Sequence, residues 1–525
     1  MKTMKSITSI LPALLFCLTA TAQTPVERVN LQDITFVRQN FDRNIYNDRI
    51  LTSRLNLQGT DLFLENSANL IIEGDKNARL SQESGRLDIL SDARTTIRVG
   101  AFHPYFCYEA DFKDLPRDSE AGIRFYSNDG SSTLTVSRQF GALRAELDGR
   151  KLASSICSDS GDLHLRVQYT GARFHVFELF GSGKARLLMS VECDMRNLDM
   201  PVKWSWGAFV SRCQGASLTR AESFLSDGTG QADPQVVQNS DGTPYIRDGR
   251  LYVCLTTRGF EQIPDSYQGV YSLSLTGYDL RLEGALFFTE GDGRMMGYHA
   301  TKVVCHEGRF LVITTTHGGP RHTLAWAEAD CDILHGIHCL ECRELDYPHK
   351  TTEGQKYGSE DPDFFFDAQA GKWRLGYCAL FSSAATGTKR SYATFLCESD
   401  NWNGPYEYMA KSGRDNNTGV RITSVGGRRY VLSGGSDTTF YIYDYPTLDY
   451  VGTFKQEFPN GGFRGWPTIV PVPYGNFERY LWITFDRGAI TGKYSYGTLY
   501  FFLGDKMWRR QTGSGNNLEQ DGLGR

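Results

Sequence analysis

A repeated pair of apolar strands in the second half of the chain constrains the fold more than any other feature. Each of five units has an apolar run, a turn that contains glycine or a polar pair, and a second, aromatic run. Successive units begin about 50 to 60 residues apart, the period of a propeller blade with about four strands. The repeats therefore predict a five-bladed β-propeller over residues 236–508. The five runs are YIRDGRLYVCLTTRG (245–259), KVVCHEGRFLVITTTHGG (302–319), FFFDAQAGKWRLGYCAL (364–380), VRITSVGGRRYVLSGGSD (420–437) and TIVPVPYGNFERYLWITFDRG (468–488).

The chain ahead of the repeats has a different pattern. Between residues 27 and 228, short runs such as LHLRVQYT (163–170) alternate polar and apolar residues, and turn signals such as Asn128-Asp129-Gly130 separate them. This spacing predicts an antiparallel sandwich. The order of the strands resembles the concanavalin-like jelly roll that is often attached to bacterial carbohydrate enzymes. We therefore expect an all-β chain, in which an N-terminal antiparallel jelly-roll sandwich precedes the propeller. A polar stretch, SDGTGQADPQ (226–235), separates the two units, and the boundary from about 226 to 240 is expected to be exposed.

The two ends of the chain lie outside these units. In residues 1–22, two lysines precede an apolar run that ends in small residues before Gln23, as in a cleaved secretory signal. A lipoprotein anchor at Cys17 is the alternative. The signal predicts a secreted protein, periplasmic or on the cell surface of a bacterium. Residues 509–525 offer few apolar side chains to bury, so we expect a flexible tail.

Charge and composition exclude several kinds of partner. The net charge is -5 and no long basic run is present, so nucleic acid is not an expected partner. No stretch after the signal approaches the ~20 apolar residues that cross a membrane, so no membrane span is expected.

Of the 12 cysteines, one lies in the signal and the others are odd in number, so few disulfides or none are expected. The run HGIHCLEC (335–342) has a spacing that could bind zinc but lies in an outer blade segment, so no metal and no cofactor are expected. The oligomeric state stays open.

Three carboxylates stand around a proline at the start of a phenylalanine-rich run, GSEDPDFFFD (358–367). The innermost strand of a propeller blade begins beside the central axis, so the residues just before its apolar run face a shared funnel. Glu360, Asp361 and Asp363 are therefore expected at the mouth of this funnel. Because proline biases the preceding residue toward extended backbone, we expect Asp361 to be extended and Glu360 to point to the opposite face.

The chain from about residue 236 to 508 resembles the five-bladed propeller glycosidases of the arabinanase and xylosidase type, and the related invertase-like families. The resemblance implies three carboxylates from three blades: a base in a first-blade Asp-Pro, an orienting Asp in a third-blade Asp-Pro, and a Glu acid before glycine in the fourth blade. Asp361 and Pro362 match the third-blade pair. Thr243 and Thr418 stand at the expected first-blade and fourth-blade positions, so two of the three carboxylates are not matched.

Other polar residues could replace the two missing carboxylates. The nearest are Asp241, Glu360, Asp363 and Asp415. His299 stands in the second blade where many relatives carry a tryptophan, and it could bond a sugar hydroxyl or act as an acid. A structural role for His299 at the axis is the alternative.

Further residues are assigned to substrate binding or to structure. Trp466 could stack on a sugar ring, or could instead cap the core, and Arg464 could pair with a carboxylate. Thr243 and Thr418 complete the expected substrate-binding residues. Four residues are expected at the ends of strands opposite the funnel: Arg258, His317, Asp437 and Asp486.

Glycoside hydrolysis normally needs one protonated carboxyl to assist the leaving group and one ionised carboxyl to activate water or attack carbon. The sequence therefore predicts a secreted glycoside hydrolase that acts on a polysaccharide or oligosaccharide in the funnel. Because two usual positions carry threonine, a non-catalytic glycan-binding protein without the acid pair is the alternative. A propeller used only for protein interaction is a third possibility. For the hydrolase and for the glycan-binding protein, the expected partner is a carbohydrate.

Overall fold

The computed structural model describes most of the chain between residues 24 and 509. The predicted signal, and the tail from residue 510 on, lie outside the described residues. Within the described part of the chain, no helix is long and apolar enough to cross a membrane. The cysteines in that part all have free thiols. The described ranges are 24–26, 29–39, 49–57, 71–74, 79–83, 85–181, 184–228, 230–258, 266–317, 322–348, 358–382, 390–414, 416–435, 439–456, 458, 466–487 and 496–509.

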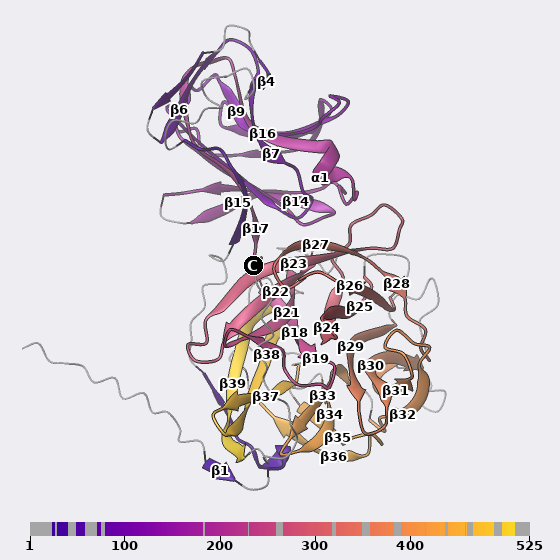
Figure 1. Ribbon diagram of the computed structural model, residues 1–525. Coiled ribbons are helices and arrows are strands. Elements are labelled where there is room, and N and C mark those ends of the chain that lie inside the picture. Colours follow the sequence, from indigo (N-terminus) through magenta and orange to yellow (C-terminus); the bar gives the residue numbers. More distant parts are fainter. Residues whose placement is uncertain are drawn as a thin grey trace, which may run out of the picture.

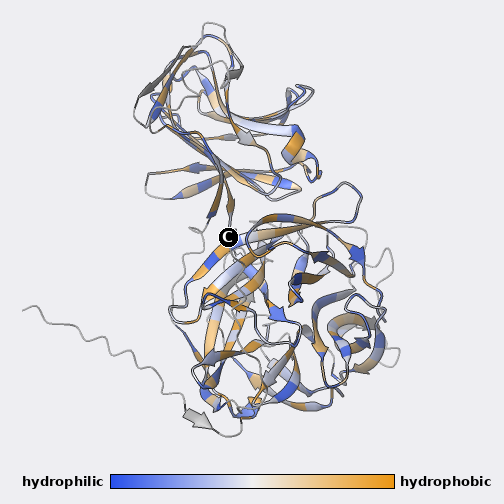
Figure 2. Cartoon of the chain, viewed as in Figure 1, coloured by the Kyte–Doolittle hydropathy of each residue, from blue (hydrophilic) through white to orange (hydrophobic). Residues whose placement is uncertain are grey.

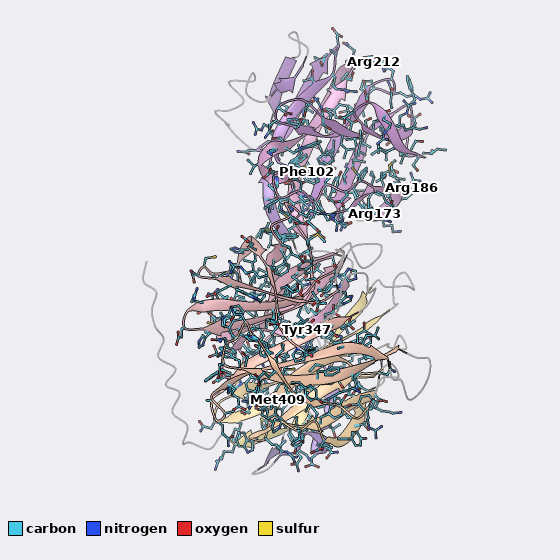
Figure 3. The ribbon with its side chains drawn as sticks, turned by 90° about the vertical axis from the view of Figure 1, so that its right-hand side faces the viewer. Phe102, Arg173, Arg186, Arg212, Tyr347 and Met409 are labelled. Carbon is cyan, nitrogen blue, oxygen red and sulfur yellow. The ribbon has the colours of Figure 1, made fainter. Side chains whose placement is uncertain are left out.

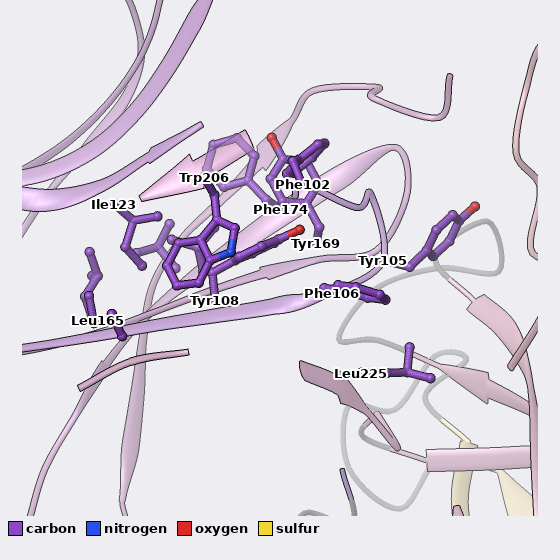
Figure 4. Close-up of a cluster of buried hydrophobic side chains, with 14 of the residues drawn as sticks. Phe102, Tyr105, Phe106, Tyr108, Ile123, Leu165, Tyr169, Phe174, Trp206 and Leu225 are labelled. Carbon is purple, nitrogen blue, oxygen red and sulfur yellow. The ribbon is translucent and has the colours of Figure 1, made fainter. Parts of the chain in front are cut away.

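The first part of the chain folds as two packed antiparallel sheets (Figure 1). Alternate residues of both sheets pack in one core, which includes Phe102, Tyr108 and Trp206 (Figure 4). One sheet has the order β12 (Arg150–Ile156), β11 (Ala142–Leu147), β10 (Thr133–Gln139), β9 (Glu120–Ser127), β16 (Trp204–Ser211), β7 (Thr95–Ala101) and β4 (Ile71–Glu73). The other has the order β15 (Ala185–Glu192), β14 (Arg173–Leu179), β13 (Leu163–Tyr169), β8 (Cys107–Lys113), β17 (Cys213–Ser226), β6 (Arg86–Ser91) and β5 (Arg79–Glu83), with β3 (Arg49–Arg54) also on β17. The short helix α1 (Met200–Lys203) precedes β16.

The second part has five further sheets, one for each blade. The first has β18 (Gly230–Val236), β21 (Arg250–Arg258), β22 (Ser266–Ser274), β23 (Leu280–Thr289) and β27 (Gly336–Glu341), with β20 (Ile246–Arg247) on β21. The second has β19 (Gln238–Asn239), β24 (His299–His306), β25 (Arg309–Thr315), β26 (Leu324–Ala329) and β28 (Arg343–Glu344). The third has β29 (Ser359–Asp367), β30 (Lys372–Ser382), β31 (Arg390–Ser399) and β32 (Glu407–Lys411), and the fourth has β33 (Thr418–Val425), β34 (Arg428–Gly434), β35 (Thr439–Asp444) and β36 (Tyr450–Lys455). The fifth has β37 (Thr468–Tyr474), β38 (Phe477–Arg487) and β39 (Tyr496–Arg509), to which β1 (Thr24–Val26) and β2 (Phe36–Arg38) are paired.

The five sheets close into a ring. Their innermost strands contact one another in the order β18, β24, β29, β33 and β37, and β37 contacts β18 again. Apolar residues recur along these strands (Figure 2) and pack between neighbouring blades. Tyr347, labelled in Figure 3, follows β28 and belongs to the core between the second and third blades. The predicted all-β chain, a sandwich followed by a five-bladed propeller, is confirmed.

The fifth blade is completed by the opposite end of the chain. Strand β1 runs parallel to β39, and β2 pairs with β39 antiparallel. Between them, the 3-10 turn η1 (Leu31–Asp33) buries Leu31 in a core with Trp482 and Phe502. These residues therefore belong to a propeller sheet, although the sequence placed everything from residue 27 in the sandwich. The outer edge of β39 is paired in this way.

The stretch between the two parts is buried, which contradicts the expected exposure of residues 226–240. Every residue of β18 is buried, because this strand is the innermost strand of the first blade. The two parts also share a core, in which Tyr105 packs on Phe287 and donates a hydrogen bond from its hydroxyl to the carbonyl of Met295. The predicted domain boundaries, 228 and 236, stay predictions, although β18 begins before the second of them.

We expect Leu31→Ala to lower the free energy of unfolding by about 2 to 4 kcal/mol, because it leaves a cavity in a packed core. Urea titration of the purified protein measures this. The matched control is Leu51→Ala, a half-exposed leucine of β3, which should cost less than about 0.5 kcal/mol. Equal effects of the two variants would contradict the role of the N-terminal segment in the fifth blade.

Candidate active site at the propeller axis

Four inner strands carry the same irregularity near their first residues. In each strand the pairing with the next strand shifts, and one residue has a positive φ. These residues are Asp233 (φ 53°), Ala300 (φ 50°), Asp361 (φ 62°) and Gly419 (φ 68°). Such bulges redirect side chains, and positive φ in a non-glycine residue costs energy that the surrounding structure must supply. The expected extended backbone of Asp361 is therefore wrong: Pro362 is accommodated within a bulge.

The bulge also turns two neighbouring carboxylates toward the same partner. Thr418 donates a hydrogen bond from its hydroxyl to Asp361 Oδ2 at 2.6 Å, and the same hydroxyl lies 3.4 Å from Glu360 Oε1. The backbone N–H of Gly419 also donates to Asp361 Oδ2, at 2.8 Å. The expectation that Glu360 and Asp361 point to opposite faces is wrong, because a bulge interrupts the alternation of a regular strand.

A second Asp-Pro pair supplies a carboxylate close to Asp361. Burial raises the pKa of Asp361 to about 7, and the negative charges of Glu360 and Asp233 add to this effect. The hydrogen bonds from Thr418 and Gly419 oppose it. Asp233 precedes Pro234 as Asp361 precedes Pro362, a signal that was visible in the sequence. It was missed because the surrounding polar residues indicated a linker.

The structure does not bring Asp241 and Thr243 to this mouth. Both follow β18 and β19, so they lie beyond the end of the inner strand that is opposite to Asp233. Asp241 Oδ1 accepts hydrogen bonds there from the backbone N–H and the hydroxyl of Thr243, at 2.8 and 2.7 Å. This pairing is that of a turn.

Three histidines of the second blade gather beside the carboxylates. His299 Nε2 lies 2.6 Å from Ser266 Oγ, and its ring stacks on the ring of His317 with centroids 4.5 Å apart. The ring of His317 in turn meets the edge of His322 at 5.6 Å. His322 Nε2 lies 3.3 Å from Glu360 Oε2, so the histidine row ends at a carboxylate.

The position expected for His317, opposite the funnel, is wrong. Strand β25 runs antiparallel to β24, so the chain returns to the mouth where β25 ends. His322 follows in the same connection and had no signal in the sequence.

Side chains of Arg258, Asp437 and Asp486 lie outside the described residues, as do Arg464 and Asp415. Within the described ranges, no group of three histidine, cysteine or acidic side chains is placed to hold a metal ion.

A buried polar layer lies two residues further along each inner strand, below the mouth. Asp363 belongs to this layer, where its Oδ1 forms an ion pair with Lys302 Nζ at 2.8 Å. Its Oδ2 accepts a hydrogen bond from the backbone N–H of Ile422 at 2.7 Å. Burial lowers the pKa of Lys302, and the charge of Asp363 opposes that shift. One buried residue per blade forms the layer: Gln235, Lys302, Asp363, Arg421 and Thr468.

Trp466 stands in the fifth blade, next to the position of the bulges in the other four. Its side chain is 1% exposed, and the guanidinium of Arg421 lies 4.2 Å from its ring. Its ring also lies against Gly419, where a Cβ atom would approach it to 3.0 Å. Trp466 is therefore buried at the level of the bulges, in a core with Ala232 and Ala300, and offers no open face to a sugar.

The chain has remote similarity to solved structures. No family model matches it, and no curated protein matches it. Levansucrase from Bacillus subtilis is 11% identical, with a TM-score of 0.38 over 54% of this chain and 87% of its own. Levansucrase from B. megaterium is 13% identical, with a TM-score of 0.36 over 54% and 85%. The carbohydrate-binding module CBM66 from Bacillus subtilis is 15% identical, with a TM-score of 0.24 over 29% and 92%. None of these similarities assigns an activity or a ligand to this chain.

Asp361 should make the stability of the protein depend on pH. Because its pKa rises from 3.8 to about 7 on folding, its contribution to stability is complete below pH 3.8 and is lost as pH rises through about 7. The difference in unfolding free energy between wild type and Asp361→Asn should therefore fall from about pH 4 to about pH 7 and level off above that pH. Urea titrations at several pH values measure it. A difference that is independent of pH would show that Asp361 is not held in a desolvated, negatively charged site.

Lys302→Met should lower the free energy of unfolding by about 3 to 5 kcal/mol, since it leaves the carboxylate of Asp363 buried without its cation. Replacing both partners, with Lys302→Met and Asp363→Leu, should recover most of this loss. Lys372→Met, which breaks an exposed pair with Asp400, serves as the control and should cost less than about 1 kcal/mol. A loss at Lys302 no larger than at Lys372 would be evidence against the buried ion pair.

Proposed function

We propose that this protein is a glycoside hydrolase that acts on a polysaccharide or oligosaccharide at the mouth of the propeller funnel. The observation that most supports this is the pairing of Asp233 and Asp361, which come from the first and third blades. Both residues stand in strained bulges before a proline, and the charge of Asp233 helps to raise the pKa of Asp361. Acid–base hydrolysis of a glycosidic bond requires two carboxyl groups, of which one carries a proton.

In this proposal Asp361 is the acid. With a pKa of about 7, its carboxyl holds a proton near neutral pH and can donate it to the glycosidic oxygen as that bond breaks. Its Oδ2 accepts two hydrogen bonds, so Oδ1 is the atom that carries the proton. Asp233 is the partner that activates the water or attacks the anomeric carbon.

Neighbouring groups take supporting roles. Positive charge develops at the anomeric carbon in the transition state, and the carboxylate of Glu360 would stabilise it. His322 lies against that carboxylate and orients it. Thr418, which stands where the resemblance expects an acid, instead donates to Asp361.

One observation favours the alternative of a non-catalytic glycan-binding protein: the fourth blade contributes a hydroxyl, not a carboxylate, to this site. Under either function we propose that the protein works outside the cytoplasm, in the periplasm or at the cell surface, because of the predicted signal at residues 1–22. Incubation of the wild-type protein with a panel of polysaccharides separates the two functions. Release of sugar supports the hydrolase, whereas binding without release supports the alternative.

Asp233→Asn and Asp361→Asn should each lower turnover on a substrate from that panel by at least ~100-fold, the scale on which positioned acid–base groups act. Both substitutions are nearly isosteric, so circular dichroism should remain that of the wild type. Asp330→Asn, an exposed carboxylate that pairs with Arg309, is the matched control and should keep full turnover. Full activity of Asp361→Asn would remove this residue from the mechanism.

A further inference from the structure

A second polar cavity lies in the sandwich, away from the propeller mouth. It has a volume of about 220 Å³ and opens on the seven-stranded sheet, between the β9–β10 and β11–β12 turns. Its lining contains no apolar side chain. The side chains on which the inference depends are Arg94, Arg124, Thr133, Thr135, Glu146 and Asp148.

The pairing register of the sheet builds the floor of this cavity. Thr135 of β10 lies directly opposite Glu146 of β11 on one side and opposite Arg124 of β9 on the other. Their neighbours along these strands, such as Ile123 and Val136, are in the sandwich core, so the row faces outward. On the next strand, Gly207 stands opposite Arg124 and adds no side chain to the row.

Neighbouring groups hold both a hydrogen-bond donor of the cavity, the guanidinium of Arg124, and an acceptor, the carboxylate of Asp148. The guanidinium of Arg124 donates to Thr96 Oγ1 at 3.1 Å and to Thr133 Oγ1 at 3.3 Å, and it lies 5.3 Å from the ring of Tyr126. Asp148 Oδ1 accepts a hydrogen bond from the backbone N–H of Thr133 at 2.7 Å. A ligand that binds here therefore meets groups that are already ordered, which lowers the entropic cost of binding.

The charges of the lining select the class of ligand. Two guanidinium groups, of Arg94 and Arg124, line the cavity together with the carboxylates of Glu146 and Asp148, and Arg94 also forms an ion pair with Glu120 at 3.3 Å. An anion would face both carboxylates, and a cation would face both guanidinium groups. An apolar ligand would take water from these groups without replacing its hydrogen bonds. An uncharged molecule with many hydroxyl groups can donate to the carboxylates and accept from the guanidinium groups at once.

The volume limits the size of that ligand. Sites for drug-sized molecules enclose roughly 300 to 1,000 Å³, so this smaller cavity suits a single ring. We propose that the cavity binds one uncharged sugar unit, at an end or a branch of a glycan chain. This site shares no residue with the funnel and does not depend on the proposed hydrolase activity.

Affinity electrophoresis of the full chain tests the proposal, with xylan, arabinan, galactan, mannan and inulin as neutral probes and polygalacturonate as the acidic probe. At least one neutral polysaccharide should retard the wild-type protein. Arg124→Ala should weaken that retardation at least ~10-fold, because it removes a charged hydrogen-bond donor from a fitted site. Arg117→Ala, an exposed arginine of the same sandwich that pairs with Asp159, should bind as the wild type does.

Glu146→Gln provides a second variant that keeps the shape of the cavity and removes one charge, in case Arg124→Ala disturbs folding. It should weaken binding in the same direction, with an unchanged thermal unfolding profile. Three results would each overturn the proposal: no retardation by any neutral probe, retardation by polygalacturonate alone, or wild-type binding by both variants. Loss of sugar release in Asp361→Asn with binding unchanged would leave this proposal standing, since the two sites are separate.

Discussion

The buried ion pair between Lys302 and Asp363 is the interaction on which the propeller axis depends. Charges removed from water are costly, and they persist in a protein only when partners satisfy them. Here each blade contributes one polar side chain to the same layer, and the ion pair joins the second and third blades at 2.8 Å. In the same layer Arg421 donates to Thr468 Oγ1 at 3.1 Å, which joins the fourth and fifth. The layer therefore holds the inner strands in the register that places the mouth residues above it.

The mouth differs from that layer because several carboxyl groups lie beside one another in it. Asp361 lies beside Glu360 and Asp233, and its Oδ2 accepts hydrogen bonds from one hydroxyl and one backbone N–H. Like charges in a desolvated site favour the protonated form, so the pKa of Asp361 rises. The backbone at Asp233 and Asp361 is also strained, since both residues have a positive φ. The rigid ring below maintains this conformation, which an isolated strand would avoid. Two adjacent layers of one axis thus differ in their electrostatics: opposite charges meet in one, and like charges meet in the other.

The two candidate sites also distribute charge in different ways. At the propeller mouth, negatively charged carboxylates lie next to one another. Their repulsion raises the pKa of Asp361. In the sandwich cavity, the guanidinium groups of Arg94 and Arg124 and the carboxylates of Glu146 and Asp148 line the same space, so hydrogen-bond donors and acceptors are mixed. The shared core around Tyr105 and Phe287 joins the parts that carry these sites.

Much of the fold could be predicted from local patterns in the sequence. Five strand–turn–strand units indicated five blades, alternating residues indicated the sandwich, and Asp361 before Pro362 indicated a carboxylate near the axis. Strand β18 could not be recognised in this way, because an inner strand that lines a polar axis has the composition of a linker. Asp233 was lost with it, although its Asp-Pro pair was visible. The side-chain direction of Glu360 was also missed, since a bulge leaves no trace in a hydrophobic pattern.

What the sequence by itself determined was the number of units, their strands and the identity of two mouth carboxylates, Glu360 and Asp361, because these depend on spacing between near neighbours. Only the tertiary structure decided that β1 and β2 complete the fifth blade, that His317 and His322 return to the mouth, and that Asp233 lies near Asp361. Each of these depends on pairing or ring closure between segments far apart in the chain. Such contacts are selected by the packing of the whole ring, and no local pattern of residues encodes them.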